Sequence, residues 1–234
     1  MQIVATWAAR TILGRLDAAA RADLLGAGVR RRYEAGHVLI HEGLFETHVI
    51  LLEDALVKVT ALLPRGRQAL MGIRVSGDIV GEMSALNEMP RSASVTTCRP
   101  ATVRLIGSQS FRSFLRKHPN AAIAVAGMVA DRLRAANRHR VDFASYPLRV
   151  RVARALLELG AWYGQRTPDG VVVDIHLTQS ELATLCGAAD ITMHKALREL
   201  READVIDTVY RGFLIRDEET LRTAARMGPC HASR

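Results

Sequence analysis

The sequence has few aromatic residues and few cysteines, and each shortage excludes a class of structure. Aromatic residues make up 5% of the 234 residues, so aliphatic side chains and alanine must fill the core. The three cysteines, Cys98, Cys186 and Cys230, are odd in number and lie far apart. Their spacing indicates neither a metal site nor a disulfide framework.

Long apolar runs and common catalytic motifs are also missing. No stretch of roughly 18 or more apolar residues occurs, and no basic-then-apolar leader with a cleavage site is present. We therefore expect a cytoplasmic protein with no membrane partner. The sequence has no Walker loop, GxGxxG or GxSxG motif, so we expect no enzyme activity. His37, His41 and His48 do not form one metal-binding face, and we expect no metal site.

Acidic residues are fewer than basic ones, and the formal net charge is +8. Such an excess favours an anionic partner. Residues 1–146 hold 20 Lys and Arg against 12 Asp and Glu, whereas residues 147–234 hold 12 of each. Net charge alone therefore does not locate a nucleic-acid interface.

The hydrophobic pattern divides the chain into a strand-rich part between helical parts. Residues 11–27 predict a short helix. Between residues 30 and 108, short runs of Val, Ile and Leu are separated by Gly, Pro and Asp, which predicts an antiparallel sandwich or barrel. The helical period returns at Phe111, and a long helix is predicted from Pro119 to about Phe143. A second helix follows Pro147 to about Leu159, and residues 164–170 have turn chemistry.

An apolar seam on the long helix predicts a contact with another surface. Its members step by 3, 4 and 3 residues, in a heptad-like pattern: Ala126, Val129, Leu133 and Ala136. The helix could pack on its own domain or pair with a second copy of the chain. The narrow seam favours the dimer, because the positions taken to face outward are charged: Asp131, Arg132, Arg134 and Arg138.

Residues 177–206 predict a helix-turn-helix. Thr178 and Glu181 form a capping box ahead of an apolar run. Gly187 supplies a tight turn, and a second periodic segment follows it. Two strands are predicted around Tyr210-Arg211-Gly212, which adds a wing. A helical hairpin followed by a β-hairpin would give the same pattern, but the combination favours DNA binding.

In this order, the three parts resemble the Crp/Fnr (cyclic-AMP receptor protein-like) family of bacterial transcription regulators. The resemblance runs from about Leu13 to Leu221. It implies an α+β fold with an N-terminal cyclic-nucleotide-binding β-roll (a double-stranded β-helix), a dimerisation helix and a C-terminal winged helix-turn-helix. The expected limits are 1–118 for the roll, 119–146 for the dimerisation helix and hinge, and 147–234 for the DNA-binding domain.

The resemblance also identifies "GEMSALNEMPRSASV", residues 81–95, as a phosphate-binding cassette. Gly81 would let the backbone approach the ligand, Glu82 would accept from the ribose 2′-hydroxyl, and Arg91 would pair with the cyclic phosphate, supported by Ser92. An Arg buried in the roll needs an anion, because an unpaired buried charge is costly. The alternative is a Glu82–Arg91 ion pair across an empty loop. The full expected ligand site is Gly81, Glu82, Met83, Arg91, Ser92, Ala136 and Asn137.

The chain departs from the family pattern at both expected sites. Ala136-Asn137 stands where members that bind cyclic AMP usually have Thr-Ser or Thr-Asn, so a hydroxyl for the base is lost. Ala189-Asp190-Ile191-Thr192 replaces the usual Ser-Arg-Glu-Thr, and Lys195 replaces a later Arg, so the usual operator is not expected. The expected DNA-binding residues are Thr178, Gln179, Asp190, Ile191, Thr192, His194, Lys195, Arg198 and Arg211.

The resemblance implies a homodimer on a palindromic DNA duplex, with a cyclic nucleotide, cyclic AMP first, as effector. RNA polymerase is a further expected partner. No metal, haem or iron–sulfur cluster is expected. For the iron–sulfur cluster the reason is that no cysteine precedes Cys98 to form an N-terminal cysteine cluster. Two alternatives stay open: a nucleotide-sensing module that acts through protein contacts, and a ligand-independent regulator with a vestigial pocket.

Overall fold

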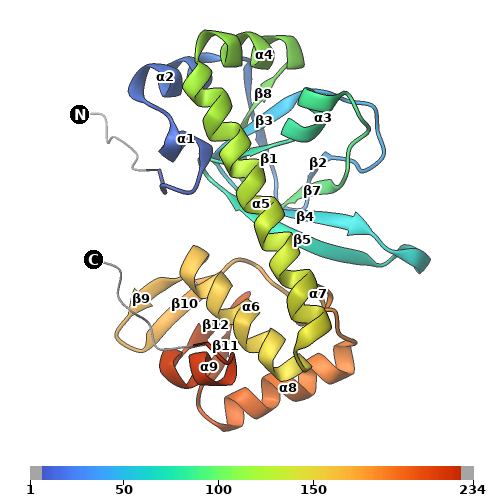
Figure 1. Cartoon of the computed structure of the whole chain (residues 1–234), viewed down its shortest axis with the longest axis vertical. Helices are drawn as coiled ribbons and strands as arrows, with labels where there is room; N and C mark the ends of the chain where they lie inside the picture. The colour runs from blue at the N-terminus through green and yellow to red at the C-terminus, as the bar shows by residue number, and fades with distance from the viewer. Residues whose placement is uncertain (1–6, 228–234) are drawn as a thin grey trace. The chain divides into compact units, whose positions relative to one another are not determined.

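The computed structural model describes residues 7–227, and Figure 1 shows the arrangement of its helices and strands. The chain divides into two compact units, Met1–Ala135 and Ala136–Arg234. The division falls inside helix α5 (Pro119–Ser145). No helix of the described part combines the length and the hydropathy needed to cross a membrane.

The N-terminal helical segment is two helices, so the prediction of one helix over 11–27 is wrong. Helix α1 covers Ile12–Arg15 and α2 covers Ala18–Gly26. Leu16 between them is extended, and the carboxylate of Asp17 accepts a hydrogen bond from the Ala20 backbone to begin a new helix. The apolar period runs across this break, which is why the pattern alone predicts one element.

Two antiparallel sheets form the strand-rich part, as predicted. The first has the order β1-β8-β3-β6 and the second β2-β7-β4-β5. The strands are β1 (Val29–Tyr33), β2 (Val38–Ile40), β3 (Val49–Asp54), β4 (Leu56–Leu62), β5 (Gln68–Val75), β6 (Ile79–Val80), β7 (Ser94–Thr97) and β8 (Ala101–Ile106). A 3-10 turn η1 (Pro64–Gly66) precedes β5, the short helix α3 (Glu82–Asn87) follows β6, and α4 (Ser108–Lys117) follows β8.

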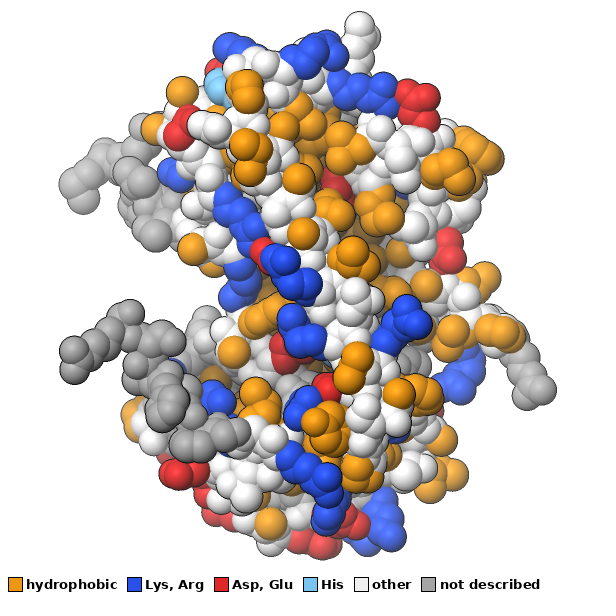
Figure 2. Space-filling view, in the orientation of Figure 1, with side chains coloured by type: hydrophobic (Ala, Val, Ile, Leu, Met, Phe, Trp, Pro, Cys, Tyr) orange, Lys and Arg blue, Asp and Glu red, His pale blue; other side chains and the backbone are white. Residues whose placement is uncertain are grey.

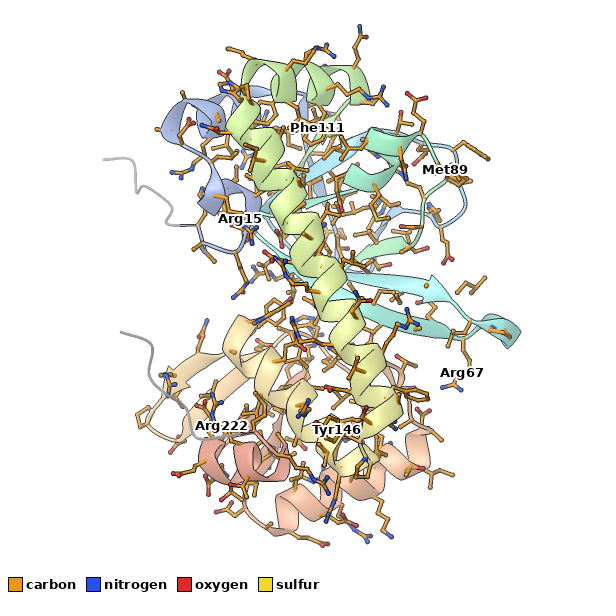
Figure 3. The ribbon with its side chains drawn as sticks, viewed as in Figure 1. Arg15, Arg67, Met89, Phe111, Tyr146 and Arg222 are labelled. Carbon is orange, nitrogen blue, oxygen red and sulfur yellow. The ribbon has the colours of Figure 1, made fainter. Side chains whose placement is uncertain are left out.

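Strand β3 shows how the core of the first unit is built. Its residues alternate between two apolar clusters, because successive side chains of a strand point to opposite faces. Val49 and Leu51 belong to a cluster with α1, α2, α4 and α5. Ile50 and Leu52 belong to a cluster made by strands of both sheets. Phe111 of α4, labelled in Figure 3, is fully buried in the first cluster.

The second unit packs helices on a third antiparallel sheet of order β11-β12-β10-β9. After the end of α5 come α6 (Leu148–Tyr163), β9 (Gln165–Thr167), β10 (Gly170–Asp174), α7 (Gln179–Leu185), α8 (Asp190–Glu202), β11 (Ile206–Val209), β12 (Gly212–Ile215) and α9 (Glu218–Ala224). The expected loop at 164–170 is therefore mostly a strand and a turn. Strand β10 pairs with β12, a strand that lies far along the chain and that local turn chemistry does not reveal.

Candidate ligand site and DNA-binding interface

The cassette begins at Gly81, which stands between β6 and α3 in a left-handed conformation with φ +80°. A Cβ at this position would lie 2.5 Å from Nη1 of Arg91 and 2.9 Å from the carbonyl oxygen of His48. Both the backbone conformation and the close approach therefore require glycine. The sequence assigned this close approach to a ligand; in the structure, the group that approaches is Arg91.

Arg91 is buried, with 3% of its surface exposed. Its Nη1 donates to the carbonyl of Gly81 at 3.0 Å and its Nη2 to the carbonyl of His48 at 2.7 Å. Its Nε is buried without a hydrogen-bond partner. Burial lowers the pKa of this guanidinium, and the charges of Glu46 and Glu82 offset only part of that effect. Among the described residues Arg91 forms no ion pair, and the groups that its guanidinium hydrogen-bonds are two backbone carbonyls.

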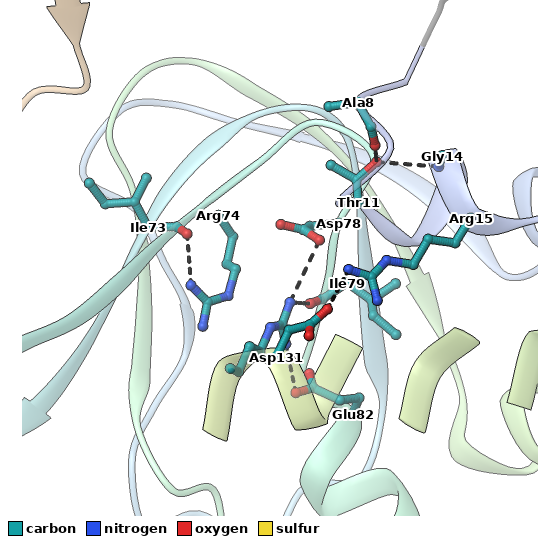
Figure 4. Close-up of polar contacts among 11 residues, drawn as sticks. Ala8, Thr11, Gly14, Arg15, Ile73, Arg74, Asp78, Ile79, Glu82 and Asp131 are labelled. Atoms are coloured by element: carbon teal, nitrogen blue, oxygen red, sulfur yellow. Dashed lines mark hydrogen bonds and ion pairs between the residues drawn. The ribbon is translucent and has the colours of Figure 1, made fainter. Parts of the chain in front are cut away.

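Glu82 is also buried, but its partner is Arg132 of α5. Oε1 of Glu82 accepts from Nη1 of Arg132 at 2.7 Å. Nη2 of Arg132 donates to the carbonyl of Ile79 at 3.0 Å and lies 3.7 Å from the carboxylate of Asp78. Figure 4 shows these contacts around Asp78, Ile79 and Glu82. The alternative of a Glu82–Arg91 ion pair across the loop is therefore wrong.

Arg132 is the site residue that the sequence reasoning missed, since it was placed among the outward charges of the long helix. Its side chain is 21% exposed and turns toward the roll. Helical spacing could have shown this, because Arg132 follows the buried Val125 and Met128 by seven and four residues. Asp131 does hold an outward position, where it pairs with Arg15 at 2.7 Å (Figure 4).

The remaining expected ligand residues differ in their surroundings. Met83 and Ser92 are exposed, and the Ser92 hydroxyl lies 3.8 Å from the sulfur of Met83. Ala136 and Asn137 are exposed on α5 within the second unit. The described residues contain no group of three or more His, Cys, Asp or Glu side chains that could hold a metal ion.

Helix α5 has one buried face and one exposed apolar face. Ala121, Val125 and Met128 are buried in the first unit. The expected seam lies mostly on the exposed side: Ala126, Leu133 and Ala136 are exposed, whereas Val129 is partly buried against the N-terminal core. Ile123 is 70% exposed and Leu133 60%. Both hydrophobic and basic side chains reach the surface over this helix (Figure 2).

The predicted helix-turn-helix is confirmed in its local geometry. The Thr178 hydroxyl accepts from the Glu181 backbone, and a Glu181 carboxylate oxygen accepts from the Thr178 backbone at 2.8 Å, which is the capping box of α7. Gly187 turns the chain toward α8 with φ +62°. A Cβ there would lie 2.7 Å from the ring of Phe143, so no other residue fits the turn without displacing this ring.

The expected DNA-binding residues share the exposed side of α8. Met193, Ala196 and Leu197 are buried, whereas the rest of the expected set on this helix is exposed: Asp190, Ile191, Thr192, His194, Lys195 and Arg198. Arg198 lies 3.5 Å from Glu202 in an exposed pair. Such pairs contribute little, so Arg198 can exchange this partner for a phosphate at small cost.

Two of the expected DNA-binding residues, Asp190 and Thr178, make hydrogen bonds within the helix-turn-helix itself. The Ser180 hydroxyl of α7 lies 3.1 Å from each carboxylate oxygen of Asp190, which ties the starts of the two helices together. Thr178 is committed to the capping box, and Gln179 is half-buried behind it. Sequence reasoning did not include Ser180, which occupies the third position of the box.

The wing is a tight turn between β11 and β12. Arg211 has φ +60°, and its guanidinium lies 4.7 Å from the ring centroid of Tyr210. Its Nη1 lies 3.4 Å from Nδ1 of His176. Tyr210 is 80% exposed, so the turn presents an aromatic ring and a cation together.

Comparisons with known proteins agree with this reading of both parts. The cyclic nucleotide-binding domain model matches residues 30–118, and the Crp-like helix-turn-helix domain model matches residues 150–224. The cAMP-activated global transcriptional regulator Vfr of Pseudomonas aeruginosa is 30% identical over 185 residues, which cover 76% of this chain and 84% of that protein. The CRP-like cAMP-activated global transcriptional regulator of Mycobacterium tuberculosis is 29% identical over 194 residues, with 83% and 87% coverage.

The fold also matches solved structures. A CRP-family transcriptional regulator from Thermus thermophilus has a TM-score of 0.70 at 25% identity, covering 84% of this chain and 96% of that one. The c-di-GMP-responsive global regulator CLP of Xanthomonas campestris has a TM-score of 0.74 at 19% identity, with 85% and 99% coverage. The chain is a DNA-binding transcription regulator and belongs to the Crp/Fnr family.

Proposed function

We propose that this protein is a homodimer whose affinity for DNA is set by a cyclic nucleotide bound in the N-terminal roll. The observation that carries the proposal is Arg91, a buried cation with an unpartnered Nε and no anionic partner among the described residues. Leaving such a charge uncompensated is costly. A cyclic phosphate beside Arg91 would supply the missing negative charge and accept charge-assisted hydrogen bonds.

Glu82 fits the ribose of the same ligand. Its Oε1 already accepts from Arg132, whereas Oε2 accepts no hydrogen bond among the described residues. A ribose 2′-hydroxyl could donate to Oε2 without breaking the ion pair. The ligand would then join Arg91 of the cassette to Arg132 of α5 through one carboxylate. That linkage gives the ligand a route to α5, which runs on into the second unit.

The exposed apolar face of α5 supports a dimer. Ile123, Ala126, Leu133 and Ala136 repeat at the spacing that lets two helices pack along a seam. A two-fold dimer presents two recognition helices to half-sites about 34–36 Å apart, the spacing known for helix-turn-helix dimers, among them the catabolite activator protein of this same family. A palindromic operator follows from that symmetry.

Calorimetric titration tests the ligand proposal directly. Cyclic AMP, cyclic GMP and c-di-GMP are titrated into the wild type and into Arg91→Ala. We expect one cyclic mononucleotide to bind, and we expect Arg91→Ala to weaken its binding roughly 10- to 100-fold, which corresponds to loss of one charge-assisted bond. Arg99→Ala, which removes an exposed arginine paired with Asp54, is the matched control and should bind as the wild type does.

The same titration separates the proposal from its alternatives. A wild type that binds none of the three ligands, together with a folded Arg91→Ala variant of unchanged DNA affinity, would show a ligand-independent regulator with a vestigial pocket. Ligand binding without any shift of random-sequence DNA in a gel would favour a sensor that acts through protein contacts. We infer a cytoplasmic location from the DNA partner, and RNA polymerase stays a predicted partner.

A further inference from the structure

Ile191 is the most exposed large hydrophobic side chain among the described residues, at 87%. It lies in the first turn of α8, whose core-facing residues are Met193, Ala196 and Leu197. A β-branched residue lowers helix propensity, and an exposed one gains nothing from burial. Neither the stability of the helix nor the packing of the unit accounts for isoleucine at this position.

The residues beside Ile191 indicate that DNA is the partner that its side chain contacts. Lys195 and Arg198 follow it by four and seven residues, so the three side chains form one stripe on the exposed face of α8. The carboxylate of Asp190 is held by the Ser180 hydroxyl of α7, which fixes the acid at the helix start. The stripe therefore presents an apolar group at the N-terminal end of α8 and cations further along.

The N-terminal residues of a recognition helix are those that contact base edges in the major groove. The apolar group that an unmodified base pair offers there is the C5-methyl of thymine. We propose that Ile191 reads a thymine methyl, so that each half-site carries a required T·A pair facing the start of α8. The proposal deepens the DNA-binding function, on which it rests, and adds a specificity-determining residue to it.

Deoxyuridine provides the test, because it differs from thymidine only by that methyl and keeps every base-pairing group. An operator is first selected with the wild-type protein from a pool of random duplexes. Each thymine of a half-site is then replaced in turn by deoxyuridine, and affinity is measured at fixed salt. We expect one symmetric position at which the replacement weakens binding roughly 3- to 5-fold per half-site, the scale of burying one methyl.

Ile191→Ala completes the test, since the exposed site makes a loss of folding unexpected. In this variant, thymine and deoxyuridine operators should bind equally. Glu199→Ala, at an exposed position of α8 outside the stripe, is the control and should keep the wild-type preference. Sedimentation of Ile191→Ala should match the wild type; a changed oligomeric state would assign Ile191 to a protein contact and overturn the proposal.

Three further outcomes would overturn it. The wild type could bind an all-deoxyuridine operator as tightly as the thymine operator, the preference could persist in Ile191→Ala, or the selection could return no thymine in the half-sites. Failure of DNA binding itself is distinguishable, because then no duplex of any sequence would bind.

Discussion

At the residue scale, Gly81 is required for two reasons: its backbone is left-handed, and a Cβ would collide with its neighbours. Comparing it with Gly36 separates the two effects. Gly81 and Gly36 have nearly the same φ, +80° and +81°, but a Cβ at Gly36 would meet nothing within 4 Å. Gly36→Ala should therefore cost only the left-handed strain, about 1–2 kcal/mol. Gly81→Ala should cost more and also displace Arg91, which reduces nucleotide binding. Urea unfolding and calorimetry of both variants check this, and equal losses of stability would contradict it.

The Glu82–Arg132 pair allows a second prediction at this scale. Removing one partner of a largely buried ion pair leaves the other charge uncompensated. Arg132→Met should lower the free energy of unfolding by about 3 kcal/mol, and Glu82→Gln should also destabilise. Because the two residues are in contact, the double variant should lose less than the sum of the single losses, by about 1 kcal/mol or more. Strictly additive losses in urea unfolding would show that the pair is not coupled.

At the scale of elements, α5 and α6 are joined through Glu158. His139 lies 2.8 Å from one carboxylate oxygen and Arg138 3.3 Å from the other. Burial raises the pKa of Glu158, but the hydrogen bonds and charges of His139 and Arg138 outweigh it, so the pKa lies below its ordinary value. A carboxylate whose pKa is lower in the folded state than in the unfolded state stabilises the protein at pH above the unfolded-state pKa. That stabilisation is lost as the pH falls through the folded-state pKa.

Glu158→Gln should therefore lower the free energy of unfolding by about 1 kcal/mol at pH 7, since the carboxylate is only partly buried. The difference in free energy of unfolding between wild type and variant should shrink as pH falls below about 4.5, the ordinary pKa range of a glutamate. Urea unfolding at several pH values between about 3.5 and 7 measures this difference. A gap that widens toward acid would show that Glu158 is not held as the charged form.

The elements differ in how far the sequence could predict them. Thr178, Glu181 and Gly187 specify their helix ends locally, and the capping box and turn are as expected. Strand β10 pairs with the adjacent β9 and also with the distant β12, and Arg132 pairs with acids that lie far from it in the sequence. The β10–β12 pairing and the contacts of Arg132 are therefore not visible in a local window. The cassette residues Glu82 and Arg91 were identified by resemblance, and their roles toward a ligand stay predictions. The alternative of an ion pair between them is wrong, because Glu82 pairs with Arg132.

At the scale of the whole molecule, the dimer is the first prediction. Leu133→Glu places a charge in the proposed seam of α5, where it would be buried against the second copy. The variant should sediment as a monomer at micromolar concentration, whereas the wild type should sediment as a dimer. Gln109→Glu, at an exposed position of α4, adds the same single negative charge and should remain dimeric. A monomeric wild type would contradict the proposal.

Binding of the nucleotide and binding of DNA should be coupled across the whole molecule. A ligand shifts the protein between two states only by its differential affinity for them. Coupling free energies are typically about 1–3 kcal/mol, or roughly 5- to 150-fold in affinity. Ala136 lacks the hydroxyl that would add a differential contact, so we expect coupling toward the low end and appreciable DNA binding without ligand.

The most direct measurement is the affinity for the selected operator, by fluorescence anisotropy at fixed salt, with and without the saturating cyclic nucleotide. The account predicts a rise of roughly 5- to 20-fold, absent in Arg91→Ala and kept in Arg99→Ala. A rise of a thousandfold or more would show that Asn137 alone carries full coupling and that the reasoning about Ala136 is wrong. An unchanged affinity in the wild type, with the nucleotide bound, would contradict the central claim that the ligand sets DNA binding.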